Sequence, residues 1–306
     1  MAILPTPAML AHWHQYVQAF VDLYASQGLK QDSASAPLCT VSDERPAQVV
    51  VCSPHPDDEV LNGLLPLRLM REAGAQVTNL AVTLGSNPLR RTARLEEMRR
   101  ACALLGFAPL TVESPHGFDR ITALSRGLDP TGWQRQVEVL ASRFAELRPD
   151  LLLFPHAGDA HPTHIGTHYL ALAAALLFSR ASRSTFWVAE TEFWHPHAAS
   201  NLLVGAHADH LALLIAALCQ HRGEISRNPY HLMLPARMTD TVRRCSERFK
   251  GAGAGEVPFL FGEAYAISRI SDGVWQVPVQ AGMVIPPIRP TTLIDLAALA
   301  GAVPGR

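Results

Sequence analysis

The stretch SPHPDDE, residues 53–59, places one imidazole and three carboxylates directly after a short apolar run, QVVVC. His55 and Asp58 are three residues apart, so one turn of chain can direct both side chains at a single point. Zn²⁺ binds imidazole nitrogen and carboxylate oxygen alike, at about 2.0–2.2 Å. Asp57 lies between them and can reach a water on such a metal without ligating it.

A simpler interpretation of the same residues is that Asp57 and Asp58 begin a helix, whose dipole favours acidic groups in the first turn. That interpretation leaves His55 unexplained. Adjacent carboxylates also repel one another unless a cation offsets their charge. We therefore favour a metal site.

A second stretch, HAGDAHPTH at residues 156–164, follows another apolar run, LLLFP. His161 and His164 are again three residues apart. A catalytic zinc site has three protein ligands and one open position for water, and His55, Asp58 and one of these two histidines would supply the three. The other histidine would be free to act as an acid or to stabilise an oxyanion. A single histidine here would be read as a loop or cap residue, but two such motifs at two strand ends are hard to attribute to chance.

Short apolar runs alternate with helical patterns along the chain. Strands are expected at 48–52, 76–84, 110–113, 151–154 and 185–188, and helices at 59–73, 90–105, 133–147, 163–179 and about 207–222. The alternation indicates an α/β fold, a Rossmann-like three-layer sandwich with a mostly parallel sheet. Ligands of such sheets bind at the carboxyl ends of the strands, where both motifs lie. A dinucleotide site is disfavoured, because PHPDDE replaces the glycine-rich turn after the first strand.

The flanking regions suggest three parts. Residues 1–46 are expected to form an amphipathic helix at 9–27 and a polar linker, residues 47–265 the main domain, and residues 266–306 a C-terminal appendage with a proline-rich tail and a short helix at 292–300. A helix at 238–248 and one or two strands within 259–278 are also expected. No run approaches the ~20 apolar residues of a membrane span, and the start lacks the basic residues of an export signal.

Composition excludes several classes of protein. The 306 residues carry 26 Lys+Arg and 27 Asp+Glu, so the charge lacks the basic excess of a nucleic-acid binder. Five cysteines without a CxxC pair argue against a disulfide framework and for a reducing compartment, so we expect a cytoplasmic protein. Of the 14 histidines, only His55, His161 and His164 lie where a metal and a reaction need them.

The PHPDDE stretch, followed about 100 residues later by HPxH, resembles the PIG-L/LmbE-like family of zinc-dependent N-deacetylases. The resemblance extends over about residues 47–265. It includes the pattern that starts at Arg94 and ends at Gly106 and, more weakly, residues 217–221 and 261–264. It implies removal of an N-acyl group, most simply acetyl, from an amino sugar or a glycosylated small molecule; N-acetylglucosaminyl phosphatidylinositol is one substrate of the family.

The resemblance also implies roles for individual residues. His55, Asp58 and His164 would ligate one Zn²⁺ per chain, although another divalent metal is compatible with the same ligands. Asp57 would be the general base that activates the water. His161 would stabilise the oxyanion and protonate the leaving amine.

Two positions depart from the family pattern. Thr163 stands where the family usually has the Asp that orients the neighbouring histidine. Asp159 stands where some members have Tyr, and we hypothesise that Asp159 partners His161 instead. Thr163 also gives some weight to an alternative, a metal-retaining but inactive sugar-binding protein. The other alternative is the same metal chemistry on a non-sugar amide or ester.

Three residues are candidates for contact with the substrate: Arg94, Asp119 and Trp194. Arg94 has a structural alternative, an ion pair with Glu97 three residues on. Specificity is expected to lie in the loops at 86–92, 114–132, 190–205 and 225–258. The N-terminal helix and the C-terminal tail are candidate contacts of a homo-oligomer.

Overall fold

The computed structural model describes residues 7–26, 45–113, 115–253, 257–277, 282–293 and 296. The predicted linker at 28–46 and the predicted helix at 292–300 lie mostly outside these residues. The helices are α1 (Pro7–Ala25), α2 (Asp58–Leu61), α3 (Leu64–Ala73), η1 (Pro88–Arg90), α4 (Arg91–Leu105), α5 (Ser125–Leu128), α6 (Pro130–Leu147), α7 (Pro162–Ser182), α8 (Ala208–Leu218), α9 (Arg222–Ile225) and α10 (Tyr230–Lys250). The strands are β1 (Gln48–Ser53), β2 (Gln76–Ala81), β3 (Ala108–Thr111), β4 (Leu151–Pro155), β5 (Thr185–Thr191), β6 (Leu202–Ala206), β7 (Phe261–Ser271), β8 (Val274–Gln276) and β9 (Met283–Ile285).

The strands form one sheet in the order β3-β2-β1-β4-β5-β7-β6-β9, and β8 pairs with β7. The part from β3 to β5 is parallel throughout, whereas β7 runs antiparallel to β5 and β6. The fold is therefore the expected α/β class with a mostly parallel sheet. After β1 the chain continues outward to β2, and after β4 it continues to β5 on the other side. The gap between the ends of β1 and β4 is thus the switch point at which ligands of open α/β sheets bind.

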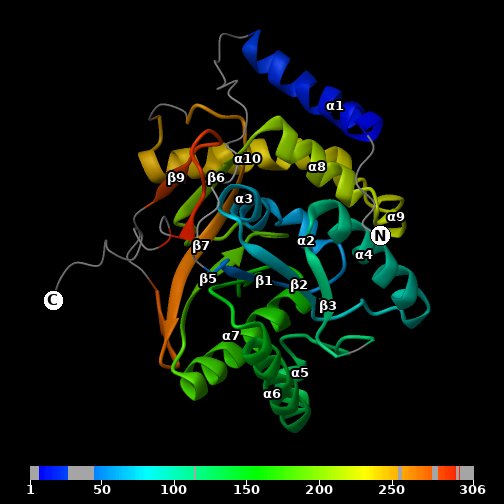
Figure 1. Ribbon diagram of the computed structural model, residues 1–306, viewed down its shortest axis with the longest axis vertical. Coiled ribbons are helices and arrows are strands. Elements are labelled where there is room, and N and C mark those ends of the chain that lie inside the picture. Colours follow the sequence, from blue (N-terminus) through cyan, green and yellow to red (C-terminus); the bar gives the residue numbers. More distant parts are fainter. Residues whose placement is uncertain are drawn as a thin grey trace, which may run out of the picture.

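Helices cover both faces of the sheet (Figure 1): α6 and α7 lie on one face, and α3 and α8 on the other, with α1 packed outside α8. The side chains of β1 alternate between two hydrophobic cores, as the two-residue period of a strand requires. Val49 and Val51 join the core beneath α3 and α8, while Val50 and Cys52 join the core beneath α6 and α7. Burial on both faces explains why the central strands are continuous apolar runs.

The helix predicted at 59–73 is broken into α2 and α3 at Asn62 and Gly63. Two side chains of β7, far away in the sequence, satisfy the backbone amides that the break frees. Leu64 N donates to Glu263 Oε2 at 3.1 Å, and Leu65 N donates to Tyr265 Oη at 3.0 Å. The periodicity of the segment carries no sign of these distant partners.

Two other expectations need correction. The sequence predicts a loop at 190–205, whereas residues 202–206 form β6. Their sequence, LLVGA, merges with the equally apolar α8, and periodicity cannot separate a short strand from a buried helix. The boundary expected after residue 265 falls inside β7, and β8 and β9 extend the same sheet.

The N-terminal helix α1 packs on the main body: Val17 is fully buried and Tyr16 Oη donates to Leu232 O at 2.7 Å.

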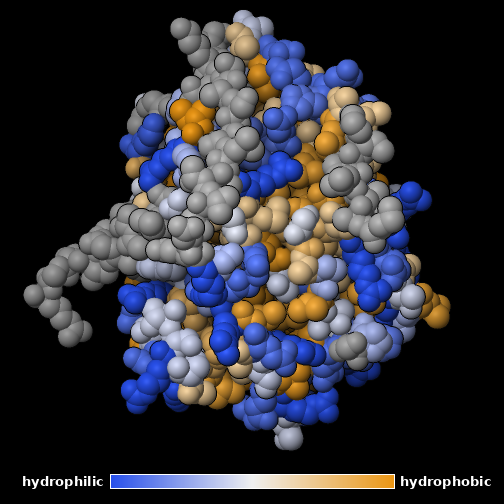
Figure 2. All heavy atoms as spheres, in the orientation of Figure 1, coloured by the Kyte–Doolittle hydropathy of each residue, from blue (hydrophilic) through white to orange (hydrophobic). Residues whose placement is uncertain are grey.

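The surface in view mixes hydrophobic residues near its middle with a mostly hydrophilic margin (Figure 2). Among the described residues, no helix combines the length and the apolar character needed to cross a membrane.

Candidate metal and active site

The loop that follows β1 carries the first motif in a strained conformation. Asp57, the residue before α2, has φ 113° and ψ −26°. Positive φ is uncommon for a residue with a side chain and costs on the order of 1–3 kcal/mol. Five non-glycine residues among those described have positive φ, and Asp57 is the buried one; the other four lie on the surface. Strain of this kind persists where the surroundings enforce it, often at functional sites.

Asp58 lies between the two motifs. Its Oδ2 accepts the backbone N–H of His55 at 2.8 Å and lies 3.5 Å from both His55 Nδ1 and His164 Nε2. Burial opposes ionisation of this carboxyl, but His164 and His55 outweigh that effect and lower its pKa to about 2. Asp58 is therefore an anionic oxygen facing two imidazole nitrogens, which is the donor set predicted for the metal.

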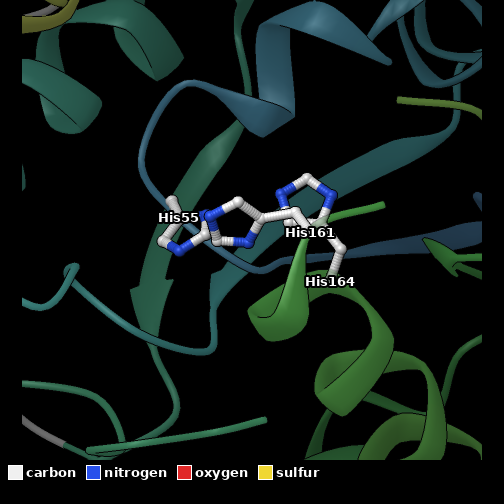
Figure 3. Close-up of side chains that lie close together, drawn as sticks. All are labelled: His55, His161 and His164. Carbon is white, nitrogen blue, oxygen red and sulfur yellow. The ribbon is translucent and has the colours of Figure 1, made fainter. Parts of the chain in front are cut away.

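The imidazole rings of His55, His161 and His164 converge from two segments, the loop after β1 and the start of α7 (Figure 3). One ring nitrogen of each lies within 4.8 Å of the others. The ring centroids of His55 and His161 are 5.0 Å apart, and those of His161 and His164 are 5.1 Å apart. The structure thus brings together all the residues proposed as ligands, and His161 with them.

The polar contacts of the ring nitrogens distinguish His161 from His164. His161 Nδ1 accepts the backbone N–H of Thr163 at 3.2 Å, so the neutral ring carries its proton on Nε2. His164 Nδ1 lies 3.5 Å from Asp159 Oδ2, which favours a proton on Nδ1 and leaves the Nε2 lone pair facing Asp58. Burial and the neighbouring histidines also lower the pKa of His161 to about 4. In these tautomers His164 can ligate a metal, whereas His161 presents a hydrogen-bond donor.

The partner hypothesised for Asp159 needs correction. Its Oδ1 accepts the backbone N–H of His161 at 2.8 Å, but its Oδ2 faces the ring of His164 and accepts the backbone N–H of Trp194 at 3.1 Å. Asp159 therefore orients His164 and not the ring of His161. Carboxylates commonly fix metal-ligating histidines in this way. Thr163 supplies its backbone amide to His161 and lines the cavity.

The charge balance of the β1 loop favours a bound cation. Asp57, Asp58 and Glu59 are consecutive, buried carboxylates. Burial, together with the charges of Asp58, Glu59 and Glu224, raises the pKa of Asp57 well above its usual value. The positive group beside Asp57 is the guanidinium of Arg94, at 3.9 Å between Nη2 and Oδ1. Two imidazoles, a carboxylate and an excess of negative charge suit Zn²⁺.

The cluster of His55, His161 and His164 opens into a cavity of about 870 Å³. All three substrate candidates, Arg94, Asp119 and Trp194, line it. Trp194 stacks on His161 with ring centroids 6.3 Å apart, and Asp119 forms an ion pair with Arg91. The lining also includes residues that the sequence analysis did not single out: Arg90, Arg91, Arg227, Glu224, Phe193 and Tyr230.

Arg94 does not form the structural ion pair with Glu97. Its Nη2 donates to Pro56 O at 2.9 Å and its Nε lies 3.6 Å from Glu224 Oε1. Glu97 instead contacts Arg90 at 3.5 Å and accepts the backbone N–H of Gly223 at 3.1 Å. Arg94 therefore lines the cavity next to the carboxylate of Asp57 and is not held by Glu97.

Contacts between histidine and glutamate side chains at two places, Glu59 and Glu190, were not predicted from the sequence. His221, between α8 and α9, places Nε2 at 2.8 Å from Glu59 Oε1. Glu190 lies 3.3 Å from His168 Nδ1 and 3.4 Å from His197 Nε2. His197 Nδ1 also accepts the backbone N–H of Ala199 at 2.9 Å, so both ring nitrogens of His197 are occupied within the protein.

Comparison with known proteins gives a family match over the part of the chain that carries both motifs. The PIG-L profile, described as GlcNAc-PI de-N-acetylase, matches residues 50–175. A relative in Catenulispora acidiphila, 1D-myo-inositol 2-acetamido-2-deoxy-alpha-D-glucopyranoside deacetylase 2, is 26% identical over 192 residues. The match covers 54% of this chain and 62% of the relative, so it spans less than two thirds of the relative's length.

Solved structures support the fold. A deacetylase from the biosynthesis pathway of teicoplanin, in complex with bog, has a TM-score of 0.52 at 17% identity, covering 73% of this chain and 98% of that one. GalB, the 4-carboxy-2-hydroxymuconate hydratase of Pseudomonas putida KT2440, has a TM-score of 0.50 at 16% identity, covering 72% and 95%. One fold thus carries a deacetylase and a hydratase, so the reaction must be argued from the site.

Proposed function

We propose, starting from the match of residues 50–175 to the PIG-L family, that this protein is a metal-dependent amide hydrolase. It removes an N-acyl group, most simply acetyl, from an amino sugar or a glycosylated small molecule. The observation that carries the proposal is the convergence of His55, Asp58 and His164 beside the buried carboxylate of Asp57, at the switch point of the sheet.

We assign the metal to His55, Asp58 and His164, one ion per chain. A Zn²⁺ held there would lower the pKa of a water from 15.7 to about 7 and polarise the amide carbonyl. Asp159 keeps the Nδ1 proton of His164 directed away from the site. His161 is left out of the ligand set because its Nδ1 is already used as an acceptor, which places its proton on Nε2.

The remaining residues move protons and stabilise charge. Asp57 accepts the proton of the attacking water and returns it to the leaving nitrogen, a general acid–base role that typically contributes 10²–10⁴-fold. His161 Nε2–H donates to the carbonyl oxygen as negative charge develops there. This assigns oxyanion stabilisation to His161, as expected, and the delivery of the amine proton to Asp57.

A sugar substrate is supported by the name of the Catenulispora relative, a deacetylase of an inositol-linked 2-acetamido sugar. The cavity is large enough for a disaccharide-sized ligand, since such sites typically measure about 300–1,000 Å³. Arg94 and Asp119 offer donors and acceptors for hydroxyl groups, and the exposed ring of Trp194 offers an apolar surface.

Two further proposals concern the setting of the enzyme. Cytoplasmic location is supported by the four described cysteines, Cys52, Cys102, Cys219 and Cys245, all of which are free. Burial raises the pKa of Cys52 to about 12, which makes it a packing residue and not a nucleophile. A homo-oligomer stays a proposal without support from the contacts of a single chain.

The test is release of free amine. Zinc-loaded protein is incubated with a panel of N-acetyl amino sugars and their glycosides, N-acetyl amino acids and simple esters. We expect amine from at least one amino sugar, and loss of that activity on removal of the metal by a chelator. Hydrolysis confined to the non-sugar compounds would favour the alternative substrate class. Metal and sugar binding without any hydrolysis would favour a sugar-binding protein.

A further inference from the structure

The strained backbone of Asp57 requires something to hold it. The carboxylate of Glu59 contacts it most directly: the backbone N–H of Asp57 donates to Glu59 Oε2 at 2.9 Å. Glu59 is fully buried. It does not line the cavity, although it belongs to the same motif as His55, Asp57 and Asp58, which do.

The other oxygen of Glu59 is held by His221. His221 Nε2 lies 2.8 Å from Glu59 Oε1, both side chains are fully buried, and 162 residues separate them in the sequence. His221 Nδ1 has no hydrogen-bond partner among the described residues. The ring therefore has a single polar contact, in which its Nε2–H donates to Glu59.

The backbone around His221 is firmly fixed. His221 N donates to Leu218 O at 3.0 Å, and His221 O accepts the N–H groups of Glu224 and Ile225 at 2.9 and 3.0 Å. Gly223 N donates to Glu97 of α4 at 3.1 Å. The junction of α8 and α9 thus provides a rigid support, which lies behind the β1 loop and is connected to it by Glu59.

We propose that Glu59 and His221 form a positioning pair that fixes the left-handed backbone of Asp57 and so directs its carboxylate at the reacting atoms. The inference rests on the proposed function, in which Asp57 is the base. Neither residue touches the metal or the substrate. A displacement of a catalytic group by about 1 Å can cost about 10²-fold in rate, so loss of the pair is expected to lower kcat while leaving KM and metal affinity nearly unchanged.

The experiment compares three histidine variants of the full chain, each loaded with zinc. H221L removes the donor, H221Q keeps an amide N–H near the position of Nε2, and H210L removes a different buried histidine, on α8, as a matched control. We expect kcat to fall roughly 10- to 100-fold in H221L, to recover to within a few fold of wild type in H221Q, and to stay unchanged in H210L. Zinc affinity, measured by chelator competition, should stay within a few fold in all three.

A double-mutant cycle separates positioning from a general structural effect. If His221 acts through Asp57, H221L lowers kcat in the wild type but causes no further loss in a D57N background. An equal loss in both backgrounds, or wild-type kcat in H221L, would overturn the inference. If H221L does not fold, E59Q replaces it. The side-chain amide oxygen introduced by E59Q can still accept the N–H of Asp57, but this variant lacks the carboxylate that accepts from His221. An unchanged kcat in a folded E59Q would count equally against the pair.

The two proposals fail in different ways. If D57N retains near-wild-type kcat, Asp57 is not the base and the proposed function is wrong. If D57N is inactive while H221L and E59Q are fully active, the function stands and only the positioning pair is wrong.

Discussion

Two buried clusters of charge on α2 and α3 differ in how completely their partners satisfy them. In α3, Arg68 is fully buried and donates through Nε to Glu72 Oε1 at 2.8 Å. Its remaining donors reach backbone carbonyls of β6 and of the segment after β9, including Gly205 O at 2.7 Å. Glu72 Oε2 accepts Thr291 N at 2.7 Å. This cluster holds the C-terminal segment against α3, and its charges balance.

The β1 loop, by contrast, holds three consecutive buried carboxylates. Asp58 faces the rings of His55 and His164, and Glu59 accepts from His221. Asp57 has a guanidinium, that of Arg94, only at 3.9 Å. The backbone is strained at Asp57, and the pKa of that residue is raised by burial and by its acidic neighbours. The comparison indicates that the Arg68 cluster contributes to stability, whereas the β1 loop, under the proposed function, is completed by a bound cation.

Replacement of Asp57 by Asn should reduce kcat by about 10²–10⁴-fold, because the amide cannot accept the proton of the attacking water. The same change removes a repelled, buried charge, and Asn tolerates positive φ. The metal-free variant is therefore expected to unfold with a free energy at least as high as that of wild type. Steady-state kinetics and urea denaturation measure the two effects. D22N, an exposed Asp on α1, is the control. A large loss of stability in D57N would contradict the contrast between the clusters.

Replacement of Arg68 by Met should lower the free energy of unfolding by about 3–5 kcal/mol, because Glu72 is left as an unpaired buried charge. The double variant R68M/E72L should lose less than R68M alone, since it removes both charges. Urea denaturation of the metal-free proteins compares them. A loss under about 1 kcal/mol in R68M would show that this cluster is not a stabilising one.

The buried carboxylate of Glu263 is intermediate between the Arg68 cluster and the β1 loop in how completely its partners satisfy it. Tyr265 and Leu64 donate to its Oε2, but its Oε1 has no hydrogen-bond partner among the described residues, and burial raises its pKa to about 7. The folded protein therefore holds a proton there that the unfolded chain, with a pKa of 4.5, releases earlier. Stability contributed by this group is present below pH 4.5 and is lost as pH rises through 7.

Glu263→Gln should remove that dependence. Between pH 4.5 and 8 we expect wild type to lose on the order of 3 kcal/mol of unfolding free energy relative to E263Q. The measurement is urea denaturation at several pH values. Parallel pH profiles for the two proteins would show that Glu263 is ionised to the same extent in the folded and unfolded states.

The smallest effect is expected at Asp119. Its side chain is 64% exposed and its ion pair with Arg91 lies at the cavity surface, so the pair contributes at most about 1 kcal/mol to stability. D119N should raise KM about 2- to 10-fold, equivalent to the loss of one hydrogen bond to substrate, and leave kcat and zinc affinity unchanged. A change in zinc affinity would place Asp119 in the metal site instead of the substrate site.

The residues that meet at the switch point could be predicted because each set is contiguous. His55 and Asp58 belong to one turn, His161 and His164 to another, and the βαβ pattern requires the two turns to be neighbours at the carboxyl ends of β1 and β4. The strand and helix alternation from residue 48 to residue 191 was predicted for the same reason, because it depends on local periodicity.

The features that sequence reasoning missed depend on partners far along the chain. The break between α2 and α3 is stabilised by Glu263, and the backbone of Asp57 is connected through Glu59 to His221. Neither contact leaves a local pattern. The prediction that Asp159 partners the ring of His161 was wrong, because two histidines in one turn are equally near in sequence. Only the geometry of the loop selects His164.

We propose that a cation held by His55, Asp58 and His164 completes the β1 loop. The most direct test is the thermal stability of metal-free protein titrated with Zn²⁺, since a ligand at 100 times its Kd stabilises the folded state by about 2.7 kcal/mol. We predict a saturable increase in Tm with one ion per chain in wild type and in H161A, and none in D58N or H164A. Loss of the increase in H161A together with its retention in D58N would contradict the account.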